Sequence, residues 1–198
     1  MLVFSKTLLG AIILCLVTAT AASEDEYQVM VPRTFTDADA TDSTIHVNRR
    51  LQFTQGSDGT RPSRLFKRFP FSSGRVEWCG EQAEDPATDF SASAPSASDC
   101  QALVNSLDNQ NGFWTLQPSD FSSDGWARIV SSGSCAFAAR YADSGSAGNP
   151  MRIGTNDISF YTTRYEPLSQ NGRLGLQGTV QCSNAEKMLF VTWGLIRS

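Results

Sequence analysis

The sequence predicts an α+β two-layer sandwich, in which two helices cover a mostly antiparallel sheet and two disulfides hold the fold. Three observations predict it: several short runs with strand patterning, two segments with helical periodicity, and four cysteines that follow an N-terminal leader. The expected order is strand, helix, three strands, helix, two strands. Helices segregated in this way favour an antiparallel sheet over a parallel one.

The N-terminus has the pattern of a secretory signal peptide. Lys6 precedes an apolar run from Leu8 to Val17, and this run of about ten residues is too short to span a bilayer, which needs about twenty. Small residues follow, and Ala19-Thr20-Ala21 fits the cleavage rule. We therefore expect a signal peptide at residues 1–21, cleavage after Ala21, and a secreted, extracellular chain without a transmembrane segment.

Residues 22–68 have the composition of a disordered pro-segment. They contain seven acidic and seven basic side chains and no sustained hydrophobic period, so they are not expected to bury enough apolar surface to offset their ordering entropy. The segment ends in Lys67-Arg68, a dibasic pair of the kind that kexin-type proteases cut. The alternative is a plain spacer in which Lys67-Arg68 and the earlier Arg49-Arg50 occur by chance.

Residues 69–198 then form one domain of about the usual size. Alternation and turn residues predict its strands. These are expected at residues 75–79, 113–116, 126–130, 135–141, 174–182 and 188–196.

Two helices are expected in this domain. Ser98 and Gln101 match a capping box at the start of the first, whose apolar stripe has helical spacing. The second begins near Asn156 and ends at the turn Asn171-Gly172. The stripe residues are Cys100, Leu103, Val104 and Leu107 in the first helix, and Ile158, Tyr161, Tyr165 and Leu168 in the second.

The cysteines of the domain predict two disulfides, because an even number in an oxidising compartment is typically paired. Cys100 on the helical stripe and Cys135 on an apolar strand face both point toward the helix–sheet interface. This favours a bond between them and leaves Cys79 to pair with Cys182. No metal site is expected, because there is no C-x-x-C pair and the only histidine, His46, is far from every cysteine.

Charge and composition limit the function classes. The domain has thirteen acidic and eight basic side chains, and its net charge of −5 argues against nucleic acid as a partner. It lacks histidine, which removes Ser-His and Cys-His catalysis. Its single lysine, Lys187, is expected at a strand rim and not as a catalytic amine. We therefore expect neither an enzyme nor a cofactor.

Two alternatives remain open on the residues alone. A glycoside hydrolase needs two separated carboxyl groups, but the candidates crowd one polar loop and are typical of a solvated face. A carbohydrate-binding module would use exposed tryptophans, yet each tryptophan lies in an apolar pattern, and at least three of the four are expected in the core. The acidic candidates are Glu81, Glu84, Asp85 and Asp89, and the tryptophans are Trp78, Trp114, Trp126 and Trp193.

Six short motifs in order resemble a known fungal domain. They are Ser98-Asp99-Cys100, Asn111-Gly112-Phe113-Trp114, Gly133 to Phe137, Ile153 to Ile158, Gln177 to Cys182, and the late Trp193. Together they resemble the necrosis-inducing factor domain family, the homologues of the second extracellular protein effector of a leaf-mould fungus. The likeness covers Cys79 to Ile196.

The resemblance implies a secreted fungal effector with four paired cysteines and a fold related to virally encoded fungal killer toxins. It implies necrosis or growth inhibition of host or competitor cells, and no catalytic residue is carried over from it. We therefore expect a monomeric effector or toxin that binds a cell-surface component. The second hypothesis is a chitin- or glucan-binding module, and the third is a small carboxylate-based glycoside hydrolase.

Overall fold

The structure is a computed structural model that describes residues 29–36, 42–56, 76–82, 84–108 and 110–198. Within these residues all paired strands are antiparallel, in one sheet of seven strands and one of three. The large sheet has the order β1 (Met30–Thr36), β2 (Asp42–Asn48), β6 (Ala127–Ser132), β7 (Cys135–Tyr141), β10 (Met188–Arg197), β9 (Gly175–Ser183), β4 (Ala87–Asp89). The small sheet is β3 (Gln52–Gln55), β5 (Gly112–Leu116), β8 (Met151–Gly154).

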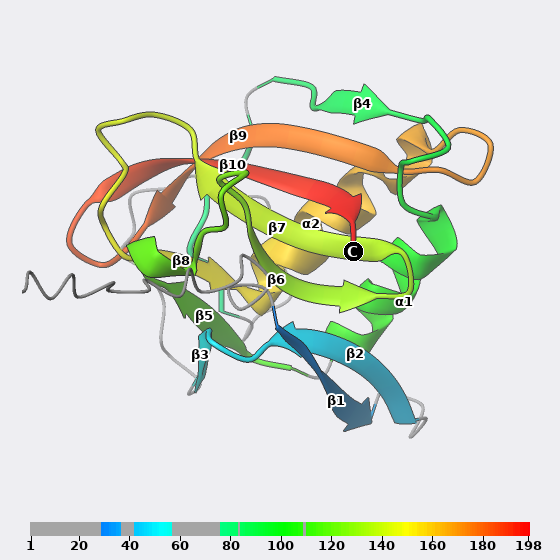
Figure 1. The fold of residues 1–198 in the computed structure, drawn as a ribbon, viewed down its shortest axis with the longest axis horizontal. Coiled ribbons are helices and arrows are strands. Elements are labelled where there is room, and N and C mark those ends of the chain that lie inside the picture. The colour runs from blue at the N-terminus through cyan, green and yellow to red at the C-terminus, as the bar shows by residue number, and fades with distance from the viewer. Residues whose placement is uncertain (1–28, 37–41, 57–75, 83, 109) are drawn as a thin grey trace, which may run out of the picture.

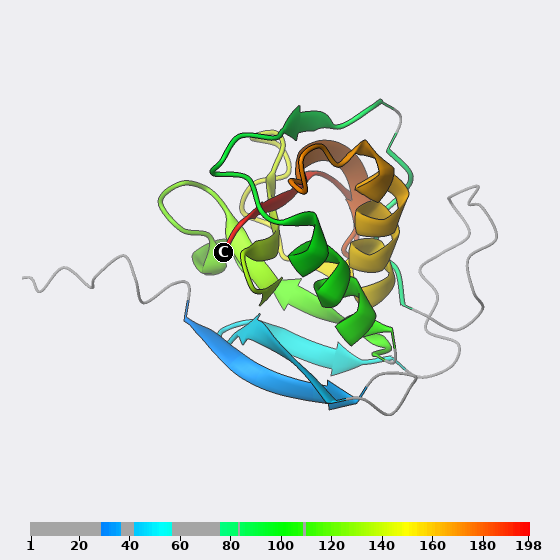
Figure 2. The same ribbon diagram turned by 90° about the vertical axis from the view of Figure 1, so that its right-hand side faces the viewer.

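The two α-helices, α1 (Ala97–Leu107) and α2 (Thr155–Tyr165), lie on the same side of the large sheet (Figures 1 and 2). The expected stripe of α1 is buried at all four positions, so its helical spacing correctly identified the side that packs inward. The predicted α+β fold with two helices and a mostly antiparallel sheet is therefore confirmed. Each helix has eleven residues, and among the described residues no helix is long and apolar enough to cross a membrane.

Trp193 of β10 lies at the centre of the core. It is fully buried, and its indole stacks on the Tyr161 ring of α2 at 4.8 Å between centroids. The Phe137 ring of β7 lies parallel to the same indole at 6.0 Å. Such aromatic contacts add to the burial of apolar area, so Trp193 joins the middle of the sheet to α2.

One expectation is wrong for part of the chain before the dibasic pair. Residues 22–68 were expected to be disordered, but β1, β2 and β3 lie within them. β2 pairs with β6, and β3 pairs with β5. Ile45, Val47 and Leu51 are buried in the main core, so apolar side chains packed against the later part of the chain accompany the pairing of these strands.

Strands β4 and β8 lie outside the expected strand ranges, so four strands and not three separate α1 from α2. Three further local expectations are wrong. Residues 75–79 form no strand where they are described, and only Cys79 makes an isolated bridge, with Cys182. Helix α1 begins at Ala97 without a side-chain cap, so the capping box of Ser98 and Gln101 is wrong. At the other helix, Leu168 lies in a 3₁₀ turn (Glu166–Leu168) and is 40% exposed, so it does not belong to the buried stripe.

Candidate functional site on the open face of the sheet

The face of the large sheet opposite the helices presents polar side chains from three neighbouring strands. Thr192 of β10 is the register partner of Arg140 in β7 and of Thr179 in β9. Because directly opposed residues of antiparallel strands point to the same side, the three side chains form one row. Thr179 is exposed, Arg140 is half-buried, and Thr192 between them is buried, with 9% of it exposed.

Trp126, just before β6, extends this row. The guanidinium carbon of Arg140 lies 4.6 Å from the centre of the Trp126 ring, a cation–π distance. Below the ring is Gly194, where a Cβ atom would come within 2.9 Å of the indole. The Arg140 guanidinium also donates a hydrogen bond of 3.4 Å to Gln177 Oε1. We call Trp126, Arg140, Thr192 and Thr179 the open-face strip.

A hollow of about 490 Å³ opens beside the strip and includes Arg140 and Thr192 in its lining. The rings of Phe121 and Tyr141 form another part of this lining, with their centroids 4.6 Å apart. The carboxylate of Asp124 is also at the hollow. The site thus combines aromatic surface, a cation, an anion and a hydroxyl, a mixture suited to holding a polar ligand with apolar faces.

Two groups that line the hollow, Tyr141 and Asp124, have shifted pKa values. Burial raises the pKa of Tyr141 to about 12, and the nearby charge of Asp120 adds to this. Partial burial alone would raise the pKa of Asp124, but hydrogen bonds from the Ser122 hydroxyl and from the backbone N–H of Trp126 outweigh it, and the pKa is lowered. Near neutral pH the phenol therefore keeps its proton and the carboxylate stays charged.

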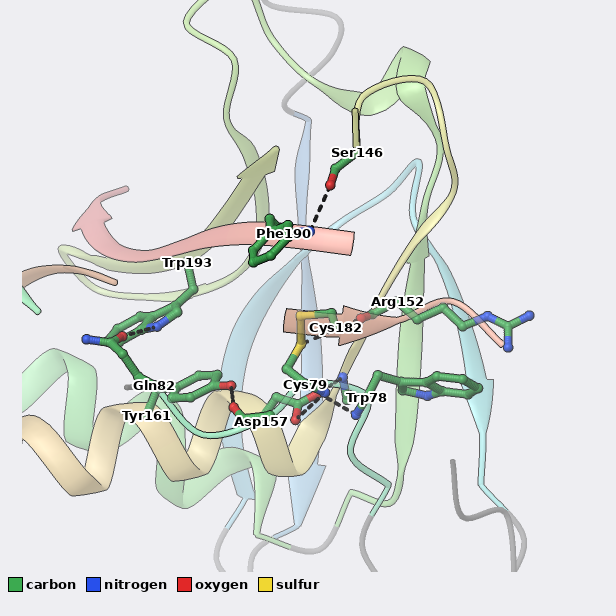
Figure 3. The surroundings of a disulfide bond; sticks show 12 residues. Trp78, Cys79, Gln82, Ser146, Arg152, Asp157, Tyr161, Cys182, Phe190 and Trp193 are labelled. Atoms are coloured by element: carbon green, nitrogen blue, oxygen red, sulfur yellow. Dashed lines mark hydrogen bonds between the residues drawn. A yellow bond between two sulfur atoms is a disulfide. The ribbon is translucent and has the colours of Figure 1, made fainter. Parts of the chain in front are cut away.

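The first disulfide joins Cys79 to Cys182 in β9, beside the start of α2 (Figure 3). Asp157 in the first turn of α2 accepts hydrogen bonds from the backbone N–H groups of Trp78 at 2.8 Å, Cys79 at 3.1 Å and Gly154 at 2.8 Å. The backbone N–H groups of Trp78 and Cys79 therefore bond to a side chain and not to a neighbouring strand. This explains why the alternating pattern does not produce a strand at residues 76–79, the part of the expected strand that the structure describes.

A second contact in Figure 3 holds the chain that follows Cys79. The indole N–H of Trp193 donates a hydrogen bond of 2.8 Å to Gln82 Oε1. The hydroxyl of Tyr161 donates to the backbone carbonyl of Gly80. These bonds satisfy two polar groups on the buried aromatic stack, so the region around this disulfide is structural.

The second disulfide joins Cys100 of α1 to Cys135 of β7. These are the same two pairs that the sequence analysis favours. Next to it, the Asp99 carboxylate accepts hydrogen bonds from the Ser134 hydroxyl at 2.6 Å and the Ser134 N–H at 2.7 Å. The hydroxyl bond, then the backbone bond, lowers the pKa of Asp99.

The acidic candidates Glu81, Glu84, Asp85 and Asp89 are all exposed. A hydrogen bond from the Ser91 N–H lowers the pKa of Asp89, whereas a general acid requires a raised one. Lys187 is exposed in the β9–β10 connection. No group of three or more His, Cys, Asp or Glu side chains suited to a metal ion occurs in the part of the chain that the structure describes.

The tryptophans behave as core residues, as expected. Trp78, Trp114, Trp126 and Trp193 are all buried, with at most 7% of any of them exposed. Sequence reasoning did not single out Arg140, Thr179 or Thr192, because the strip appears only when the register of three strands is known. The processing residues Ala21, Lys67 and Arg68 lie outside the described residues.

These features define a class of protein: an α+β domain with two disulfides, a structural core around Trp193, and a polar and aromatic surface on its open sheet face. Residues 78–182 match a family model described as "Pathogen effector; putative necrosis-inducing factor". Since the match covers more than half of the chain, the protein belongs to this pathogen effector family. No curated protein matches the chain. The matched region ends before β10, which lies inside the large sheet, so the folded unit extends beyond it.

Proposed function

We propose that the protein is a secreted effector that causes necrosis or inhibits growth by binding a surface component of host or competitor cells, without a chemical step. Family membership supports the effector role. The observation that carries the binding mechanism is the open-face strip beside the hollow of about 490 Å³. Arginine and aromatic side chains are enriched at protein binding surfaces, and the strip places the Arg140 guanidinium over the Trp126 ring.

The protonation states in the hollow favour binding over catalysis. General acid–base catalysis works best when the pKa of the group is near the working pH. The pKa of Tyr141 is about 12 and that of Asp124 is lowered, so both are shifted away from neutrality. Asp124 therefore offers a fixed charge and Tyr141 a neutral phenol, which suits recognition of a polar ligand.

The carbohydrate-binding alternative has less support from the aromatic residues. Sugar rings need an exposed aromatic face, but all four tryptophans are buried and Arg140 covers one side of Trp126. Phe190 of β10 is 46% exposed and belongs to the open face, but it is a single ring. We therefore expect little retention of the purified protein on chitin or glucan beads.

Infiltration of the purified full-length protein into plant tissue, beside a fungal growth assay, tests the proposal. The variant Arg140→Ala removes the cation of the strip, and we expect it to reduce activity at least tenfold while its circular dichroism stays that of the folded wild type. Arg164→Ala is the matched control, because Arg164 is an exposed arginine over the Phe160 ring of α2, away from the strip. Equal activity of both variants would exclude the strip as the binding surface.

We also propose that the chain is cut at two places during secretion. The signal peptide is removed after Ala21 and the chain is cut after Lys67-Arg68. Two disulfides are typical of secreted proteins and support export to an oxidising compartment. Mass spectrometry of the culture filtrate should find a new N-terminus at Phe69, and only intact chains starting near Ala22 would contradict the second cut.

A further inference from the structure

Residues 30–36 and 42–56 supply strands to both sheets. Figures 1 and 2 show β1, β2 and β3 along one side of the molecule, next to strands from the later part of the chain. In the large sheet, Val47 of β2 is the partner of Val130 in β6. In the small sheet, all four residues of β3 pair with β5, from Gln52 with Thr115 to Gln55 with Gly112. Without this segment, β6 and β5 would each present an unpaired edge.

Apolar anchors accompany the strand pairing. Ile45 is fully buried, and Val47 and Leu51 are 8% and 7% exposed. All three belong to the same core cluster as Leu103 and Leu107 of α1. Burial of such side chains is the main driving force for association of two protein surfaces, so this segment fills part of the core and does not only cover it.

We call the boundary between strands β1, β2 and β3 and the later domain the seam. Aromatic and polar contacts add to its strand pairing and apolar burial. The ring of Phe53 lies 4.8 Å from the ring of Trp114 in β5. The side-chain amide of Asn48 donates a hydrogen bond of 3.0 Å to the backbone carbonyl of Arg128. Backbone pairing, a buried apolar cluster and side-chain bonds thus all join residues 30–56 to the later domain.

The dibasic pair lies in the sequence between Gly56 and Val76. Both of these residues bond to the same residue, Asn111. Gly56 donates its N–H to the backbone carbonyl of Asn111 at 2.7 Å. Val76 donates its N–H to the side-chain Oδ1 of the same Asn111 at 2.8 Å. Lys67-Arg68 lies between these two anchors in the sequence. A cut there leaves each new chain attached through its own contacts.

We propose that residues 30–56 remain bound to the domain after cleavage at Lys67-Arg68, as a strand-donating second chain. The mature effector is then a complex of two chains from one precursor, and the open edges of β6 and β5 are the binding site for the N-terminal chain. The association is non-covalent, because residues 22–68 contain no cysteine. The proposal rests on the cleavage proposed above, but its test does not depend on necrosis activity.

The test uses the full chain with the residues around Lys67-Arg68 replaced by the recognition sequence of a site-specific protease, so that cleavage is complete. After digestion, the products are passed over a native gel-filtration column and each peak is examined by mass spectrometry. We expect both chains in one peak at a ratio of one to one, and a melting temperature that rises with protein concentration. Elution in separate peaks, or precipitation of the domain upon cleavage, would overturn the proposal.

Two variants of the same protein examine the seam itself. Val47→Asp places a charge in the buried seam, whereas His46→Asp places the same charge at the exposed neighbouring position of β2. After cleavage, we expect the N-terminal chain to be lost from the domain peak in Val47→Asp and retained in His46→Asp. Loss or retention in both variants alike would contradict a seam held by these apolar anchors.

Discussion

Asp157 holds Cys79 in place, because its carboxylate accepts the Cys79 N–H at 3.1 Å while Cys79 forms the disulfide to β9. The same carboxylate accepts the N–H groups of Trp78 and Gly154. We expect Asp157→Ala to lower the free energy of unfolding by about 3 kcal/mol or more, because three buried donors lose a charged acceptor. Urea denaturation followed by circular dichroism measures this effect.

Two further variants make this prediction specific. Asp157→Asn keeps one acceptor oxygen, so its cost should be clearly smaller than that of the alanine variant. Glu186→Ala changes an exposed acidic residue in the β9–β10 connection and should stay within about 0.5 kcal/mol of the wild type. An alanine variant at Asp157 that is as stable as Glu186→Ala would contradict the role given to this carboxylate.

The two disulfides should differ in their contribution to stability. Cys79 and Cys182 are 103 residues apart, whereas Cys100 and Cys135 are 35 apart. In the chain-entropy view, closing these loops stabilises the protein by about 5 and 4 kcal/mol. The uncut double variant Cys79→Ala/Cys182→Ala should therefore be less stable than Cys100→Ala/Cys135→Ala in urea denaturation, and the reverse order would refute this explanation.

The bond between Asp99 and Ser134 predicts a pH dependence of stability. Hydrogen bonds from Ser134 lower the pKa of Asp99 in the folded state, below its unfolded value of about 3.9. The resulting stabilisation is fully present above the unfolded pKa, and it is lost as pH falls through the folded pKa. Wild type should exceed Asp99→Asn by about 1 to 2 kcal/mol at pH 7, and the difference should shrink below about pH 4.

Ser134→Ala provides the control for this prediction. It removes the hydroxyl donor to Asp99 but leaves the backbone donor. In its background, the Asp99→Asn substitution should cost less at pH 7 than it does in the wild type, because part of the interaction is already absent. A cost that is the same in both backgrounds and at all pH values would show that Asp99 acts in another way.

Sequence patterns correctly predict an element when apolar residues recur on the side that packs against the core, as they do in α1. The α1 stripe of Cys100, Leu103, Val104 and Leu107 is buried as expected. The same stripe correctly predicts that Cys100 points toward the sheet, where it bonds to Cys135. The segment from residue 75 to 79 has equally good strand alternation, but Asp157 occupies the N–H groups of Trp78 and Cys79. A long-range side-chain partner leaves no local pattern.

The N-terminal strands and the open-face strip could not be predicted for a related reason. Residues 22–68 are polar on average, and among those that the structure describes, Ile45, Val47 and Leu51 are buried in the core and Phe53 packs against it. The strip consists of Arg140, Thr192 and Thr179 on three strands, which come together only through strand register. Composition measures neither of these relationships.

The last prediction concerns Gly178, which is the register partner of Trp193. A Cβ atom at this position would lie 1.6 Å from Gln82 Oε1 and 2.7 Å from Trp193 Nε1. In Gly178→Ala the Gln82 side chain must therefore move away, and its hydrogen bond to the Trp193 indole is lost. We expect a loss of about 1 to 3 kcal/mol in the free energy of unfolding, because the indole N–H stays buried without an acceptor.

The double variant Gly178→Ala/Gln82→Ala separates the lost hydrogen bond from simple crowding. Gln82→Ala by itself removes the acceptor of Trp193 without adding an atom near Gly178. If displacement of Gln82 is the main effect, Gly178→Ala will cost less in the Gln82→Ala background than in the wild type. Urea denaturation of the four proteins measures the coupling. An equal cost in both backgrounds would mean that the new methyl group acts on Trp193 directly, and that the bond to Gln82 is not why glycine is needed here.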